Sequence, residues 1–188
     1  MEANVKFEII GVEIKHQIDY DEYGMSEDIG KFTNTWEPGA LVRSQRARNE
    51  YQMRYFVSTN NVWRDWKTSW EHVPEEDKAA TIKKYGSLKA AMFHYAKEDM
   101  KRLENLGRTW NFIGVSCHVM IRITLGEHTF SDQIYDSIYG VESDSPEGIK
   151  DIEQDLIANV QSDLIDIGFS IIEIEQAFRN IRRVEDYS

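Results

Sequence analysis

The stretch WNFIGVSCHVMIRITL, residues 110–125, decides the fold. From Ile113 to Leu125 every second residue is apolar, and the positions between them are mostly small or polar. Such strict alternation is typical of a β-strand with one face turned to a core. Gly126-Glu127 then favours a two-residue hairpin turn with glycine first. We therefore predict a strand over 110–125, with Thr129–Ile138 returning beside it.

A second alternating stretch covers Val5–Ile18. Its apolar residues are odd-numbered up to Ile9 and even-numbered from Val12 onward, so the alternation slips at Gly11. A glycine at such a slip indicates a β-bulge. Tyr51–Val57 is a further, shorter strand candidate.

The C-terminal third carries two helix signals. Ser145-Pro146 begins a helix whose apolar residues recur at helical spacing, and Gly168 ends it. Ser170 and Glu173 fit a capping box for a last helix, which we expect to run to about Ile181.

Two further helices are predicted in the middle of the chain, one from Pro74 to near Gly86 and one that Ser87 caps, running to about Leu106. Together these elements predict an α+β fold, an antiparallel sheet of about four strands with helices packed on one face. The length fits a single domain over 1–188, with a possible helical insertion over about 60–108.

The overall charge narrows the classes of partner. The chain has 33 acidic and 22 basic side chains, a formal net charge of −11. Such a protein repels nucleic acid and anionic membrane surfaces, and it is attracted to basic protein surfaces. Its hydrophobic content of 41% is enough for a core, which excludes a disordered chain.

The cellular compartment is suggested by the absence of cysteine pairs, of a signal-peptide pattern and of long apolar stretches. Cys117 is the sole cysteine, so the chain forms no internal disulfide, which suits a reducing environment. The first residues lack the pattern of a signal peptide, and no stretch approaches the roughly 20 apolar residues of a membrane span. We expect a soluble cytoplasmic protein that does not bind membranes.

No catalytic or metal-binding motif stands out. The histidines, which show no spacing typical of metal ligands, are His16, His72, His94, His118 and His128. Cys117 lies within an apolar strand face, which is typical of a buried structural thiol. We predict a protein that is not an enzyme and holds no metal or cofactor. An enzyme with a cleft of scattered acids and histidines is the alternative.

Basic and aromatic side chains are interleaved between residues 43 and 70. The candidates are Arg43, Arg46, Arg48, Trp63, Trp66 and Trp70. Such a segment can bind single-stranded nucleic acid by stacking and phosphate contacts. The tryptophans are also spaced like one face of a helix, which indicates a packed core. Two alternatives follow, a nucleic-acid-binding accessory protein or a protein-interaction module that uses the tryptophan face.

The strongest signal is acidic. Between Asp132 and Glu175 there are twelve acids and a single base, Lys150. The candidate contact residues are Glu142, Asp144, Glu147, Asp151, Asp155, Asp163 and Asp166. Like charges one helical turn apart cost about 0.2–0.5 kcal/mol per pair, and Asp163 and Asp166 stand at the helix end where carboxylates are disfavoured. Stability alone would have placed basic residues there, so the acids indicate a function.

A row of carboxylates about 5.4 Å apart imitates part of the phosphate array of DNA. The simpler alternative is that an acidic surface aids solubility.

Four segments of the sequence follow one another in an order that is typical of one protein family. They are Tyr95–Glu104 (YAKEDMKRLE), Trp110–Gly114 (WNFIG), Tyr139–Ser145 (YGVESDS) and Leu164–Phe169 (LIDIGF). The chain resembles a family of small acidic proteins encoded by phages, prophages and plasmids. Members carry a Trp-Gly-Ile/Val-Glu-Ser-Asp-Ser segment after a strand pair and before an acidic helix, and here Tyr139 replaces the tryptophan.

This resemblance implies a setting rather than an activity. Small acidic proteins of mobile genetic elements often inhibit host defence, as anti-CRISPR and anti-restriction proteins do. We therefore expect a non-enzymatic protein of the host cytoplasm that inhibits a nucleic-acid-handling defence system by occupying a basic surface, with DNA mimicry as one route. The expected partner is a host nuclease or effector complex, and direct binding of nucleic acid is not expected.

Overall fold

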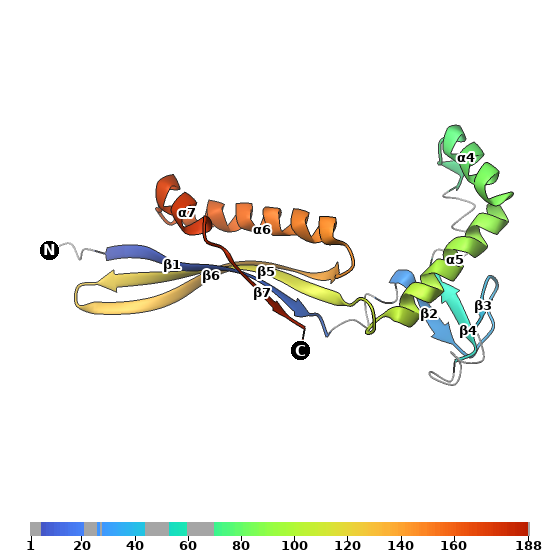
Figure 1. Ribbon diagram of the computed structural model, residues 1–188, viewed down its shortest axis with the longest axis horizontal. Helices are drawn as coiled ribbons and strands as arrows, with labels where there is room; N and C mark the ends of the chain where they lie inside the picture. The colour runs from blue at the N-terminus through green and yellow to red at the C-terminus, as the bar shows by residue number, and fades with distance from the viewer. Residues whose placement is uncertain (1–4, 21–25, 27, 44–52, 60–69, 188) are drawn as a thin grey trace. The chain divides into compact units, whose positions relative to one another are not determined.

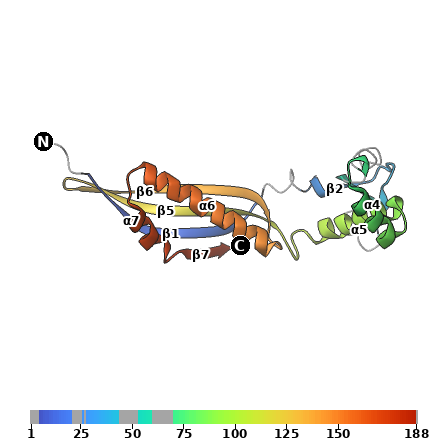
Figure 2. The ribbon, with the colours of Figure 1, turned by 90° about the horizontal axis from the view of Figure 1, so that it is seen from above.

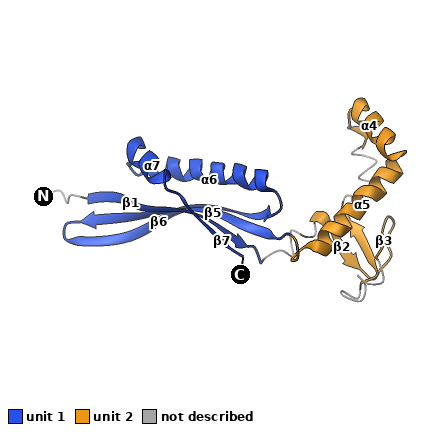
Figure 3. Cartoon of the chain, viewed as in Figure 1, with its two compact units in different colours: residues 1–20, 110–188 blue, residues 21–109 orange. Residues whose placement is uncertain are grey.

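The computed structural model describes residues 5–20, 26, 28–43, 53–59 and 70–187. The chain divides into two compact units (Figure 3). Unit 1 comprises residues 1–20 and 110–188, and unit 2 comprises residues 21–109. Unit 2 is therefore an insertion between the first strand of unit 1 and the rest of it. The possible helical insertion over about 60–108 lies within unit 2, which also contains three strands.

Unit 1 is built on a four-stranded sheet in the order β6-β5-β1-β7 (Figure 2). β5 (Phe112–Leu125) lies between β6 (His128–Glu142) and β1 (Val5–Ile18) and pairs with both in antiparallel fashion. Leu125 pairs with His128, so the predicted hairpin turn is confirmed.

The predicted bulge in β1 is also confirmed. The register of β1 against β5 shifts between Ile9, which pairs with Ile121, and Gly11, which pairs with Met120. The extra residue brings the apolar side chains before and after the bulge to the same face of the sheet.

The fourth strand corrects the expectation of a wholly antiparallel sheet. β7 (Arg182–Asp186) pairs in parallel with Glu13–Gln17 of β1, so the sheet is mixed. β6 and β7 run in the same direction, and the chain between them must cross the sheet, which a helical connection does. The strand expected at Tyr51–Val57 belongs to the sheet of unit 2 instead. The predicted α+β class is confirmed.

Two helices make that crossing and cover one face of the sheet (Figure 2). They are α6 (Pro146–Asp166) and α7 (Ile171–Phe178). The capping box of α7 is confirmed, because the Ser170 hydroxyl accepts a hydrogen bond from the backbone N–H of Glu173 and the Glu173 carboxylate accepts one from the N–H of Ser170. No helix in the described part of unit 1 covers the other face (Figure 1).

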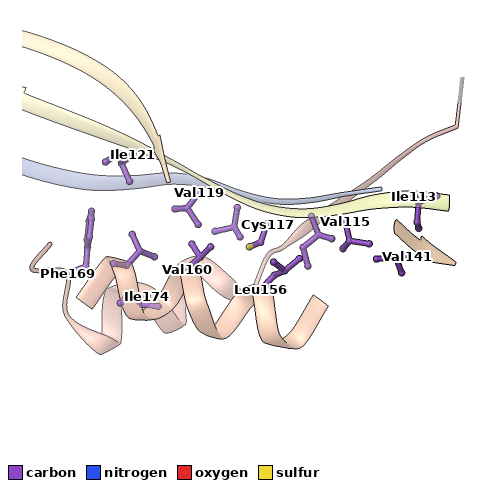
Figure 4. Packing of buried hydrophobic residues seen from close by; sticks show 13 residues of the cluster. Ile113, Val115, Cys117, Val119, Ile121, Val141, Leu156, Val160, Phe169 and Ile174 are labelled. Atoms are coloured by element: carbon purple, nitrogen blue, oxygen red, sulfur yellow. The ribbon is translucent and has the colours of Figure 1, made fainter. Parts of the chain in front are cut away.

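The core of unit 1 lies between the sheet and these helices (Figure 4). β5 contributes alternate residues, Ile113, Val115, Cys117, Val119 and Ile121, all buried. α6 contributes Leu156, Val160 and Leu164, which are at most 1% exposed. One side of α6 is thereby fixed against the sheet, and its other side faces solvent on a rigid support.

Unit 2 packs α5 (Leu88–Asn105) against a three-stranded sheet in the order β2-β4-β3. The strands are β2 (Gly30–Thr33), β3 (Leu41–Val42) and β4 (Tyr55–Ser58). Leu41, Phe56 and Ala96 form its buried cluster, against which Phe32, Met100 and Leu103 pack.

α4 (Glu75–Tyr85) precedes α5. As predicted, Gly86 ends α4 in the left-handed conformation, and the Ser87 hydroxyl caps α5 by accepting from the N–H of Ala90. Among the helices in the described ranges, none is long and apolar enough to cross a membrane.

Candidate functional site

The candidate site is the solvent-facing side of α6. The opposite side of this helix is buried against the sheet through Glu153, Leu156, Val160 and Leu164. The exposed carboxylates on the outer side are Glu147, Asp151, Asp155, Asp163 and Asp166. We call these five residues the acidic row.

The acidic row follows the whole length of the helix. At 1.5 Å per residue, Glu147, Asp151 and Asp155 are about 6 Å apart along the axis, and Glu147 and Asp166 are about 29 Å apart. Lys150 is the only base in α6. In the described part of the chain, none of the five carboxylates has a hydrogen-bond or ion-pair partner that would neutralise it. The row is therefore exposed to solvent and is not paired with any described residue.

The two ends of the row differ in their effect on the helix. Glu147 lies in the first turn, where the positive end of the helix dipole stabilises a carboxylate. Asp163 and Asp166 lie in the last turns, which hold no basic residue, and there the dipole destabilises them. The C-terminal end of the row therefore lowers the stability of the helix.

Glu142 and Asp144 lie beside the row rather than in it. Glu142 is half-buried at the end of β6, opposite Phe112, and Asp144 is exposed in the turn before α6. Both interact with other groups of the protein. They extend the acidic surface at the start of α6.

One acid of the same helix points the other way. Glu153 is 7% exposed, and its carboxylate accepts hydrogen bonds from His16 Nε2 at 2.9 Å and from the Arg183 guanidinium at 3.1 Å. These three side chains join α6 to β1 and β7. Glu153 is therefore a structural residue of unit 1 and not part of the acidic row.

The alternative basic and aromatic segment is placed only in part. Arg43 is 1% exposed, donates from Nε to Glu104 at 3.0 Å, and lies 3.9 Å from the centre of the Phe32 ring. It belongs to the interior of unit 2 and does not reach a nucleic acid at the surface. Trp70 is half-buried. Arg46, Arg48, Trp63 and Trp66 lie outside the described residues.

Cys117 has the properties of a core residue. It is 0% exposed, and burial, with smaller effects from Asp136 and Glu153, raises the pKa of its thiol to about 11. At neutral pH the thiol is protonated, and the thiolate is the nucleophilic form. Cys117 is therefore an inert side chain of the folded protein.

His118 lies on the face of the sheet that no described helix covers. Its Nε2 is 2.8 Å from the Ser116 hydroxyl, Nδ1 contacts the Gln133 amide, and its ring stacks on that of Tyr135. Burial and the nearby charge of Lys15 lower the pKa of His118. Within the described ranges, no three His, Cys, Asp or Glu side chains are grouped so as to hold a metal ion.

Sequence reasoning missed two features of this unit. The uncovered face exposes Tyr135 and Tyr139 at 62% and 53%. Along the N-terminal half of β1, no strand of the described residues pairs with the edge that faces away from β5, because β7 pairs only with the other half. Both features depend on how helices and strands pack together. Local sequence patterns do not reveal this packing.

Comparisons with protein-family models, with curated proteins and with solved structures give no match to this chain.

Proposed function

We propose that the protein is a non-enzymatic binding protein whose acidic row engages a basic surface of a nucleic-acid-handling protein. One observation carries the proposal. Five exposed carboxylates follow a rigid helix over about 29 Å, with one base among them. Because like charges at this spacing and acids at a helix C-terminus both cost stability, solubility alone is a weak reason for their placement.

The charge density of the row limits what it imitates. A DNA duplex carries one charge per about 1.7 Å of axis, so about 29 Å of duplex carries about 17 charges. The acidic row carries five. It therefore fits a sparser set of basic side chains than a duplex requires, and it covers only part of a duplex-binding surface.

The biological consequence follows from the resemblance to proteins of mobile genetic elements. A protein that occupies the basic surface of a host nuclease or effector complex excludes nucleic acid from it. This gives inhibition of a nucleic-acid-handling defence system, of the anti-CRISPR or anti-restriction type, as the proposed role. The burial of Arg43 against Glu104 removes one of the contacts on which the alternative of direct nucleic-acid binding depends.

The test compares two triple charge reversals. One variant changes Glu147, Asp151 and Asp155 to Lys, and the matched control changes the exposed Glu127, Asp132 and Glu175 to Lys. Each reversal adds two charges, so both variants have a net charge of −5 in place of −11. The measurement is displacement of a labelled DNA duplex from candidate nucleases and effector complexes, at low and at physiological salt.

We expect the wild-type protein to displace the DNA, and the row variant to do so at least about tenfold less well, because charged contacts across an interface are lost. The control variant should remain close to wild type. Equal losses in both variants would show that only net charge matters, and no loss in the row variant would exclude the acidic row as the contact surface.

A further inference from the structure

β1 has two neighbouring strands over only part of its length. β5 pairs with it from Val5 to Ile18, whereas β7 pairs only with Glu13–Gln17 (Figure 2). From Val5 to Ile9, before the bulge, no strand in the described part of the chain lies along the edge that faces away from β5. Such an edge presents unpaired backbone N–H and C=O groups, which can pair with another strand.

A groove runs beside this open edge. Lys6, Phe7, Glu8 and Ile9 form one side of it, residues Phe169, Glu173, Gln176 and Ala177 form the other, and its volume is about 430 Å³. Phe7 is 39% exposed and meets the Phe169 ring edge-on, with 6.1 Å between ring centres. Val5 is 45% exposed. A strand added to the edge would find both free backbone groups and apolar side chains.

The sequence of the edge is complementary to itself. Val5, Phe7 and Ile9 alternate with Lys6 and Glu8, so the outer positions on either side of Phe7 are both apolar and the two inner positions carry opposite charges. In an antiparallel pair of two such segments centred on Phe7, Lys6 of each copy lies opposite Glu8 of the other. Val5 lies opposite Ile9, and the two Phe7 rings meet at the axis. Opposite charges and aromatic pairs in these positions stabilise an antiparallel pair.

We propose that the open edge of β1 binds a second copy of this chain, in an antiparallel pair of the Val5–Ile9 segments about a twofold axis at Phe7. In a twofold interface, if one residue contacts a second residue of the other copy, the second residue makes the same contact in return. Each of the cross-strand pairs in this segment is favourable when it occurs twice in this way. Glu8 already accepts a hydrogen bond from Arg122 at 2.9 Å. In the dimer its carboxylate lies between Arg122 of its own copy and Lys6 of the other.

The dimer joins the two sheets of unit 1 into one. The twofold axis is perpendicular to the sheet, since the strands pair edge to edge, so the α6 helices of both copies lie on the same face of the continuous sheet. The pairing covers few residues, and small interfaces give weak complexes. We therefore expect a dissociation constant in the micromolar range.

The test uses charge changes that distinguish self-pairing from damage to the fold. Lys6→Glu brings a new carboxylate opposite Glu8 of the other copy, and Glu8→Lys brings a new ammonium group opposite Lys6. Each variant alone therefore opposes like charges in both cross-strand pairs. A mixture of the two variants restores opposite charges in the heterodimer. Glu127→Lys, in the turn between β5 and β6, makes the same change in net charge as Glu8→Lys and is the control for that variant.

Sedimentation velocity from about 1 to about 300 µM, at physiological ionic strength, measures the association. We expect wild type and Glu127→Lys to dimerise equally, each edge variant to dimerise roughly tenfold more weakly, and the equimolar mixture to recover wild-type association. Thermal unfolding of each variant checks that unit 1 is folded.

Three results would overturn the proposal. The first is a wild-type protein that remains monomeric over the whole range, which would leave the edge for a strand of a different protein. The second is a wild-type dimer that neither edge variant weakens, since it would then form elsewhere. The third is a pair of weakened variants whose mixture does not associate.

Discussion

Both faces of α6 carry carboxylates, but the carboxylate on the inner face is buried and paired, whereas those on the outer face are exposed. On the inner face, Glu153 is 7% exposed and is bound by His16 and Arg183. On the outer face, Asp151 and Asp155 are exposed and no described residue neutralises them. Residue type alone therefore does not say whether an acid of this helix serves the fold or a partner. The inner carboxylate contributes to stability, whereas those of Asp151 and Asp155 cost stability or leave it unchanged.

The two faces should differ most in the change in free energy of unfolding when one carboxylate is removed from each. Glu153→Ala leaves His16 without its buried partner and frees Arg183, and we expect it to lower the free energy of unfolding by about 3 kcal/mol. Asp155→Ala, the matched change on the outer face, should stay within about 0.5 kcal/mol of wild type. Urea denaturation of both variants measures this, and equal losses would remove the distinction between the faces.

A smaller effect on stability should come from ionisation of a buried group, the Cys117 thiol, at high pH. The pKa of Cys117 is raised from 9.0 to about 11 in the folded protein, so between these pH values the unfolded thiol ionises while the folded one stays protonated. The folded state binds more protons there, and stability therefore falls as pH rises. Two pKa units correspond to at most about 2.7 kcal/mol, and relaxation around the thiolate should reduce this to roughly 1–2 kcal/mol.

The measurement is the free energy of unfolding of wild type and of Cys117→Ala at several values between pH 8 and pH 11. Wild type should lose more stability than the variant, since lysine and tyrosine side chains titrate equally in both. Parallel curves for the two proteins would show that the thiol ionises in the folded state as it does in the unfolded chain.

The smallest expected change in stability comes from neutralising one carboxylate at either end of the acidic row. Asp163→Asn removes a charge that the helix dipole disfavours and should stabilise the protein by about 0.3–1 kcal/mol at low salt. Glu147→Gln removes a favoured charge and should destabilise it by a similar amount. Thermal unfolding at low and high salt checks both signs. Stabilisation by both variants would show that repulsion along the row, rather than the dipole, dominates.

Sequence patterns predicted the local features of unit 1 well. The alternation in residues 110–125, the slip at Gly11 and the hairpin turn each depend on a few neighbouring residues, and all three are found. β7 could not be predicted in this way. Its sequence, RRVED, shows no alternation of apolar and polar residues, and its place in the sheet depends on a parallel pairing with residues far away in the chain.

The candidate site was predictable in part. The outer acids of α6 follow from helical spacing, and they are exposed as expected. Glu153 stood in the same acidic stretch, but it lies four residues after Ile149 and three before Leu156, which places it on the apolar side of the helix. That signal could have separated it from the others. The burial of Arg43 had no such signal, because its partner Glu104 is 61 residues away.

The position of unit 2 within unit 1 has a consequence for synthesis on the ribosome. β1 ends at Ile18 and its neighbour β5 begins at Phe112. At about 5–20 residues per second, β1 is made roughly 5–20 s before β5 exists to pair with it. Unit 2 is complete by then, while β1 still has neither of its neighbours. The central sheet therefore forms only after β5 has been made. Slower synthesis between these two strands prolongs the time for which the unpaired apolar strand β1 is open to other chains.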